Sequence, residues 1–129
     1  MMQPKDRTRL KHMKEYAEEA KNLAMETTRE KLATDRKLEL ALTRLVEIIG
    51  ETAARVSTQT RVQYPDIPWL EMTGLRNRLI HGYGAVDLDI LWDIIQEDLP
   101  SLIQRLKVLL ENEKPPCFKK PDRCLTCKK

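Results

Sequence analysis

Apolar residues recur every three or four positions along the start of the chain, as they do on one face of an α-helix. After Pro4, this spacing predicts an amphipathic helix over roughly residues 5–28. Its apolar positions are Leu10, Met13, Ala17, Ala20 and Ala24.

A second apolar stripe follows the pair Thr34-Asp35, which offers an N-cap for a second helix. The stripe consists of Leu38, Leu42, Leu45, Ile49 and Val56, and it is widened by Ala41, Val46 and Ile48. A stripe this wide is typical of a helix that packs against more than one neighbour. Gly50 lies inside it at a cost of ~1 kcal/mol relative to alanine, so we expect a close helix approach or a dimer contact there.

Residues 64–68 (Tyr-Pro-Asp-Ile-Pro) must break the helical pattern, because a proline disfavours helical backbone in the residue before it. Pro68 is well placed at the start of a third helix. We expect Gly82 and Gly84 to end this helix. Its apolar positions are Trp69, Leu70, Met72, Leu75, Leu79 and Ile80.

Asp87 can cap a fourth helix that extends to about Glu113. Pro100 falls inside this helix and should kink or split it. The apolar positions are Leu88, Leu91, Ile94, Ile95, Leu102, Ile103, Leu106 and Leu110. The chain shows no strand pattern and no internal repeat. Four helices with short connections predict an all-α, up-and-down bundle of four main helices over residues 1–113.

The composition supports a helical domain, because 33% of residues are charged and only 5% are aromatic. The net charge of +3 permits a nucleic-acid partner without requiring one. No apolar run approaches the ~18 residues of a membrane span, and the charged N-terminus lacks the apolar segment of a signal peptide. We therefore expect a cytoplasmic protein with no membrane contact.

Residues 114–129 form a basic, cysteine-containing C-terminal tail outside the predicted bundle. Its three cysteines are Cys117, Cys124 and Cys127. The last two have zinc-ligand spacing, but a closed structural zinc site needs four ligands. The tail is therefore either a reduced, flexible segment or a zinc site completed from elsewhere. Its lysines could add non-specific attraction for RNA phosphate.

Residues 76–83 (Arg-Asn-Arg-Leu-Ile-His-Gly-Tyr) gather the side chains needed to handle a phosphodiester without a metal ion. The guanidiniums of Arg76 and Arg78 can bind phosphate, and Asn77 lies between them. His81 is one of only two histidines in the chain and can transfer protons near neutral pH. These residues are the candidate catalytic and substrate-binding groups.

On a regular helix, Asn77 and Arg78 would both lie close to His81. Arg76 would point about 140° away from His81, because the two residues are five positions apart. The two could then meet at one phosphate in three ways. The arginine could reach across, the helix could be distorted near residues 80–82, or the partner residue could come from a second subunit.

The motif Arg76-x4-His81-x-Tyr83 resembles the signature of the HepT-type HEPN ribonuclease toxins. The resemblance extends over roughly residues 35–110 in order and spacing. It includes residues 45–51 (Leu-Val-Glu-Ile-Ile-Gly-Glu), Ile67-Pro68-Trp69, residues 74–77, and residues 87–102 with Trp92 and Asp98-Leu99-Pro100. The cysteine tail has no counterpart in this resemblance.

The resemblance implies a HEPN-like homodimer in which two such motifs face each other across a cleft that accepts RNA. It implies metal-independent RNA cleavage, with Arg76 and His81 as catalytic residues and no cofactor. It also implies a cognate antitoxin, a minimal nucleotidyltransferase of the MntA type. That partner uses ATP and blocks the toxin by transferring AMP to the tyrosine at the position of Tyr83.

Each of these residues also has a purely structural interpretation. His81 could make an ordinary hydrogen bond at a helix end, and Tyr83 could be a buried anchor. Arg76 and Arg78 could form ion pairs with Glu71 or Asp87.

Glu47 and Glu51 share a helix face and could suggest a metal pair, but a salt bridge or a solvated face is the simpler interpretation. The spacing leaves open whether His81 acts as an acid or a base. One alternative function is a non-catalytic, substrate- or nucleotide-binding partner of a minimal nucleotidyltransferase.

Overall fold

The computed structural model of the chain describes residues 2–81 and 85–112, apart from the side chains of His81 and Ala85. Tyr83 and the three cysteines of the tail lie outside the described residues. Within the described part, no helix is long and apolar enough to cross a membrane.

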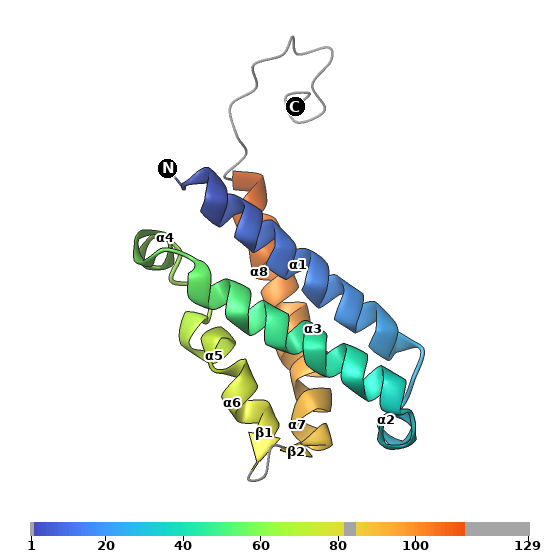
Figure 1. Ribbon diagram of the computed structural model, residues 1–129. Helices are drawn as coiled ribbons and strands as arrows, with labels where there is room; N and C mark the ends of the chain where they lie inside the picture. Colours follow the sequence, from blue (N-terminus) through green and yellow to red (C-terminus); the bar gives the residue numbers. More distant parts are fainter. Residues whose placement is uncertain (1, 82–84, 113–129) are drawn as a thin grey trace, which may run out of the picture.

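Four helical arms run alternately down and up, as Figure 1 shows. The first two arms are α1 (Pro4–Met25) and α3 (Arg36–Arg55), which pack against each other. The third arm consists of α5 (Trp69–Thr73) and α6 (Leu75–Leu79), which pack on α3. This arrangement confirms the prediction of an all-α, up-and-down bundle.

The fourth arm rises beside α1 and consists of α7 (Leu88–Asp93), the π-helix η1 (Ile94–Asp98) and α8 (Leu99–Asn112). The helix predicted to kink or split at Pro100 is not split, because the backbone stays helical from α7 through η1 into α8; the turn before Pro100 is π-helical instead. Proline has no N–H to continue the α-helical pattern, and in the preceding turn Leu99 donates its N–H to the carbonyl of Ile94.

The apolar periodicity did not predict two short helices in the connections. They are α2 (Arg29–Thr34), capped by Thr28, and α4 (Thr58–Gln63), capped by Ser57. A helix of six residues has too few apolar positions to show a period. The first helix ends at Met25, before the predicted boundary at residue 28, and Thr28 already caps α2.

The predicted N-caps of two main helices are confirmed. The carboxylate of Asp35 accepts a hydrogen bond from the N–H of Leu38, at 3.1 Å, at the start of α3. The carboxylate of Asp87 accepts bonds from the N–H groups of Asp89 and Ile90 at the start of α7. Both caps satisfy backbone donors that have no partner within the helix.

The prediction that the third helix runs on to Gly82 and Gly84 is wrong. The arm is interrupted at Gly74 and leaves the helical conformation at Ile80, where ψ is 120°. There it forms β1 (Ile80–His81), which pairs antiparallel with β2 (Ala85–Val86). This short ladder also corrects the expectation of no strand.

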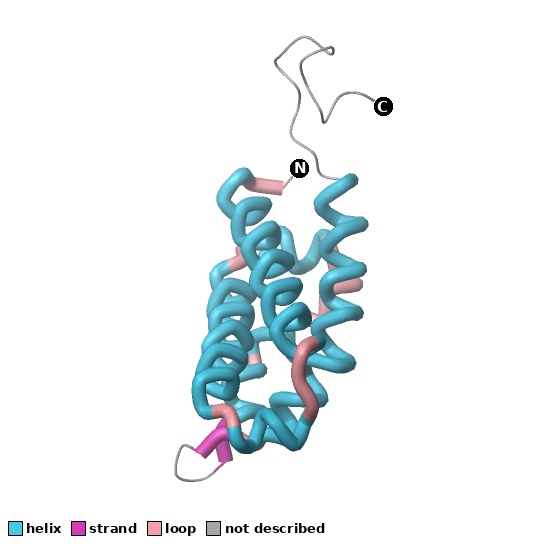
Figure 2. Tube along the Cα trace, turned by 90° about the vertical axis from the view of Figure 1, so that its right-hand side faces the viewer, coloured by secondary structure: helices cyan, strands magenta, loops and turns pink. Residues whose placement is uncertain are grey.

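The helix ends early because the returning chain hydrogen-bonds to the carbonyl of its last residue, Leu79. The N–H of Asp87 donates to the carbonyl of Leu79 at 2.8 Å, and Ile80 faces Val86 across the ladder. In Figures 1 and 2, the pair of strands lies at the end of the bundle opposite the start of α1 and the end of α8.

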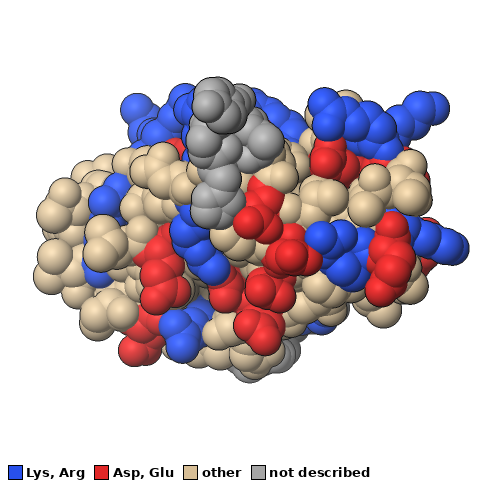
Figure 3. All heavy atoms as spheres, turned by 90° about the horizontal axis from the view of Figure 1, so that it is seen from below, with Lys and Arg blue, Asp and Glu red and all other residues tan. Residues whose placement is uncertain are grey.

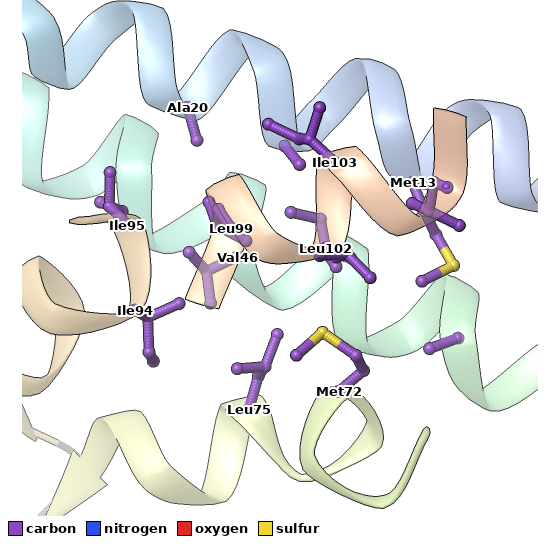
Figure 4. Packing of buried hydrophobic residues seen from close by; sticks show 14 of the residues in the cluster. Met13, Ala20, Val46, Met72, Leu75, Ile94, Ile95, Leu99, Leu102 and Ile103 are labelled. Carbon is purple, nitrogen blue, oxygen red and sulfur yellow. The ribbon is translucent and has the colours of Figure 1, made fainter. Parts of the chain in front are cut away.

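A single apolar cluster fills the space between the four arms. Figure 4 shows side chains from α1, α3, α5, α6, η1 and α8 converging on it. The labelled members are Met13, Ala20, Val46, Met72, Leu75, Ile94, Ile95, Leu99, Leu102 and Ile103. Burial of each large side chain of this kind stabilises the fold by about 1.5–3 kcal/mol, so the cluster holds α6 firmly against α3.

Gly50 permits the close approach of α3 to α5. A Cβ atom at this position would lie 3.0 Å from the carbonyl oxygen of Met72 and 3.7 Å from the Cβ of Leu75. The expectation of a close helix approach is thus confirmed.

Asp6 ties the start of α1 to the start of α4. Its side chain is buried and accepts hydrogen bonds from Ser57 Oγ (2.5 Å), Thr60 Oγ1 (2.6 Å) and Arg9 Nη1 (3.2 Å). Burial alone would raise the pKa of Asp6, but these hydrogen bonds outweigh burial and hold the pKa below its ordinary value.

Candidate active site

Helix α6 presents the candidate cationic residues to the solvent. Leu75 and Leu79, four positions apart, are fully buried and fix one face of this short helix in the core. Arg76, Asn77 and Arg78 lie between them and are exposed. The structure therefore places all three where an external ligand can reach them.

His81 follows two residues after the end of α6, in β1. The argument that Asn77 and His81 share a helix face is wrong, because the backbone is already extended at Ile80. A distortion near residues 80–82, one of the three ways in which Arg76 and His81 could meet, is thus present at Ile80, and the meeting itself stays a prediction. The His81 side chain and Tyr83 lie outside the described residues.

A cleft of about 430 Å³ opens between α3 and the α6–β1–β2 segment. Arg76 lines it, together with residues from both strands that flank positions 82–84. The full set of lining residues is Arg36, Glu39, Leu40, Thr43, Glu47, Arg76, Leu79, Ile80 and Val86. The lining thus includes Ile80, the residue before His81, and Val86, the residue after Ala85.

Within the cleft, the guanidinium of Arg76 is held only weakly. Its Nε lies 3.7 Å from Glu47 Oε2, too far for a good hydrogen bond, and the Arg76 side chain is 68% exposed. An exposed pair of this kind contributes about 0–1 kcal/mol. Arg76 can therefore exchange Glu47 for another anion at little cost.

The α3 wall of the cleft is polar. Arg36 and Glu39 form an ion pair one turn apart, and Glu47 lies two turns further along. The hydroxyl of Thr43 is buried and has no hydrogen-bond partner in the described part of the chain. The wall therefore offers polar side chains of both charges to a bound ligand.

Arg78 is held more firmly than Arg76. Its Nη1 donates to Asp98 Oδ2 at 2.7 Å, and its side chain is 41% exposed. Asp98 is the last residue of η1, so the π-helical turn is the element that supplies this partner. Both arginines are thus ion-paired, but with Glu47 and Asp98 and not with the expected Glu71 or Asp87.

The carboxylates Glu47 and Glu51 form salt bridges, as the simpler interpretation predicted. Glu51 Oε1 lies 3.4 Å from Arg44 Nη1 on the same helix, and Glu47 contacts Arg76. Among the described residues, no three histidine, cysteine, aspartate or glutamate side chains gather as a metal site would require. The cysteine tail is outside that part of the chain.

The sequence did not identify Glu47 and Asp98 as partners of the two arginines. It left Glu47 as a possible metal ligand, a salt-bridge partner or part of a solvated face, and Asp98 only as part of a matching segment. The polar spacing of Arg36, Thr43 and Glu47 along α3 is visible in the sequence. It identifies a cleft wall only once the packing of α6 on α3 is known.

Comparison with known proteins finds relatives that are named as ribonucleases. The "Probable ribonuclease HepT" of Thermococcus cleftensis is 41% identical over 96 residues, which cover 69% of this chain and 87% of that protein. A protein of Methanocaldococcus jannaschii, named as a candidate RNase, is 37% identical over 75 residues (58% of this chain and 69% of that protein). A protein of Caldanaerobacter subterraneus subsp. tengcongensis, also named as a candidate RNase, is 35% identical over 85 residues (66% of this chain and 76% of that protein). No solved structure matches the chain.

The sequence profile of the family described as Ribonuclease HepT-like matches residues 13–109. This region contains the four helical arms almost completely, the cleft and the motif from Arg76 to Tyr83. The chain therefore belongs to the HepT-like ribonuclease family.

Proposed function

We propose that this protein is a metal-independent endoribonuclease and the toxin of a cytoplasmic toxin–antitoxin pair. The family supports ribonuclease activity. The observation that carries the proposal is the position of Arg76, which is exposed and only weakly paired in a cleft bounded by β1 and β2. Arg76 and His81 are the catalytic residues, and Asn77 and Arg78 bind substrate.

The reaction needs only a cation and a proton-transfer group. The ribose 2′-oxygen attacks the adjacent phosphorus, an O2′–P bond forms and the P–O5′ bond breaks. A proton leaves the 2′-hydroxyl and another reaches the departing 5′-oxygen, and the His81 imidazole serves one of these transfers. Arg76 stabilises the negative charge that builds on the phosphorane oxygens. No cofactor is consumed.

Glu47 tunes the resting state of this site. The weak pair at 3.7 Å keeps the guanidinium of Arg76 over the cleft until a phosphate replaces the carboxylate. Phosphate offers Arg76 a bidentate, charge-assisted contact, which is stronger than the single long contact to Glu47. Substrate entry therefore displaces Glu47 from Arg76.

The active form is a homodimer with the motif at or beside the interface. Leu40 supports this arrangement, because it lines the cleft close to Arg76 and is 52% exposed. A second copy that packed on Leu40 would remove this apolar surface from water. A second copy would also close the cleft around the RNA.

Tyr83 is the proposed site of control. The cognate minimal nucleotidyltransferase transfers AMP from ATP to the Tyr83 hydroxyl, two residues after His81. A bond forms between the tyrosine oxygen and the α-phosphorus, the bond between the α- and β-phosphates breaks, and pyrophosphate and the hydroxyl proton leave. The added phosphate then competes with RNA for Arg76 and repels the incoming backbone. Inhibition requires occupation of the cleft and no change of fold.

The nuclease proposal is tested by incubating the purified protein with RNA in EDTA. The wild type should cleave, and Arg76→Ala and His81→Ala should lose at least about 100-fold in rate, the size of general acid–base and charge-stabilisation effects. Arg55→Ala is the matched control, because Arg55 is an exposed arginine in the last turn of α3.

Strict dependence of cleavage on magnesium would overturn the mechanism. A wild-type chain that cuts no RNA and arrests no growth would instead favour the non-catalytic partner of a nucleotidyltransferase.

A further inference from the structure

Positive and negative charge are separated along the bundle. Residues 5–14, in the first half of α1, contain five lysines and arginines and one acid, the buried Asp6. Residues 79–104, which include β1, β2, α7 and η1, contain five acids and no lysine or arginine. The acids are Asp87, Asp89, Asp93, Glu97 and Asp98.

The end of the molecule that carries β1 and β2 is therefore no uniform phosphate-binding surface. Seen from this end, acidic side chains gather near the middle of the surface, with basic ones beside them (Figure 3). Arg29 and Arg78 lie there too, but they are paired with Asp89 and Asp98. Long-range attraction of an RNA backbone to this end is thus partly cancelled.

A basic groove lies between α1 and α8, at the other end of the bundle. It has a volume of about 430 Å³ and is lined by Arg7, Lys11, Lys14, Lys107, Leu110 and Glu111. We use "basic groove" for these six residues. Four of them are cations and one is an acid.

Three of the four cations of the basic groove form a row along α1. Arg7, Lys11 and Lys14 share one face of α1, because they are spaced four and three residues apart. Lys107 lies across the groove on α8. Lys14 is partly neutralised by Glu18 at 3.1 Å. Lys11 and Lys107 are exposed and form no ion pair with any described residue.

We propose that the basic groove binds the phosphodiester backbone of the RNA at a distance from the cleavage site. This inference rests on the proposed ribonuclease function. Neighbouring cations along α1 are about 5–6 Å apart at Cβ, similar to successive phosphates on an extended strand. Because α1 alone is ~33 Å long, only an RNA of several nucleotides can contact the basic groove and the cleft together.

An RNA backbone fits the groove better than an acidic protein does. Three of the cations follow one line along α1, Lys107 lies across the groove from them, and all four have long, flexible side chains, which suits a regular row of charges of one sign. Only Leu110 offers an apolar anchor, whereas protein interfaces are usually centred on larger apolar or aromatic residues. Binding here would raise affinity without reading sequence, as backbone contacts do.

The test compares two double variants with the same change of charge. Lys11→Gln with Lys107→Gln removes two cations of the basic groove. Lys21→Gln with Lys31→Gln removes two exposed lysines outside it and is the control. Binding of a long single-stranded RNA and of a dinucleotide is measured across a salt series. The His81→Ala background prevents cleavage during the measurement, and thermal melts confirm folding.

The groove variant should bind long RNA at least about fivefold more weakly, with a salt slope lower by about 1.4, as expected for two lost contacts on a single strand. Its binding of the dinucleotide should match that of the control. In proteins that retain His81, the groove variant and the control should also cleave the dinucleotide at the same rate.

An equal loss of affinity for long RNA in both double variants would show that net charge alone explains the effect, and it would overturn the proposal. Unchanged RNA binding with weaker binding of the nucleotidyltransferase would make the groove a protein-docking surface and also overturn it. Absence of cleavage by the wild type would defeat the nuclease function separately, because the binding measurements do not depend on catalysis.

Discussion

Arg78 and Asp98 are joined by a hydrogen-bonded ion pair of 2.7 Å that links the end of α6 to the end of the π-helix η1. The pair connects two arms of the bundle at the level of the candidate active site. It also occupies one side of a guanidinium that we assign to substrate binding.

Removing the charge of Asp98 should therefore free Arg78 for phosphate. For Asp98→Asn we expect two- to fivefold tighter RNA binding at low salt and a loss of stability of about 1 kcal/mol, the size of a partly exposed pair. The control is Asp93→Asn, which removes the same charge from an exposed position on α7. If both variants bind RNA equally well, the pair does not restrain Arg78. Binding titrations and urea melts provide the two readouts.

Glu47→Gln tests whether the carboxylate competes with RNA for Arg76. We expect KM to fall about two- to fivefold, because the competing anion is lost, while kcat changes less than about twofold. Glu51→Gln, one turn further along α3, is the matched control, because its partner is Arg44. A fall in kcat of about 100-fold would instead make Glu47 a participant in proton transfer.

The carboxyl of Asp6 should make stability depend on pH in the acid range. Because the pKa of Asp6 is lower in the folded state than the ordinary value of about 3.9, its contribution is present above pH 4 and is lost as pH falls through the folded pKa. Asp6→Asn should cost about 1–3 kcal/mol at pH 7, and less as the pH falls below 4. Denaturant melts of both proteins from pH 7 to pH 3 measure this convergence. A difference that stays constant over this range would show that packing, and not charge, explains the cost.

Leu40→Glu should weaken the proposed homodimer. The wild type should be a dimer in light scattering at micromolar concentration, and the variant should dissociate at least about tenfold more readily, because a charge is placed at an apolar contact. Its melting temperature at a concentration where both proteins are monomeric should be unchanged, since Leu40 is 52% exposed. Val62→Glu, at a position that is 74% exposed on α4, is the control. A monomeric wild type would refute the dimer itself.

Tyr83→Phe tests control by AMP. Incubation with the cognate nucleotidyltransferase and ATP should add the mass of one AMP to the wild type and none to the variant, because phenylalanine lacks the acceptor hydroxyl. Ribonuclease activity of the modified wild type should fall, and that of the variant should persist. Equal addition to both proteins, or to neither, would refute the role of Tyr83 while leaving the nuclease proposal standing.

The sequence by itself determined the helical class, the two long arms α1 and α3, and the caps at Asp35 and Asp87. These features depend on interactions within a few residues along the chain, so the spacing of apolar and capping residues is enough to reveal them. The candidate residues Arg76, Asn77 and Arg78 could also be identified from the sequence, because they belong to a local motif.

Only the tertiary structure decided where the third arm ends and which groups surround Arg76. The helix stops at Leu79 because Asp87, eight residues further on, returns to bind its carbonyl. Glu47 reaches Arg76 because the core packs α6 against α3, and Asp98 reaches Arg78 from the π-helix. These two ion pairs join residues that are 20 or more positions apart. Their geometry depends on the packing of whole helices, which local spacing along a chain does not encode.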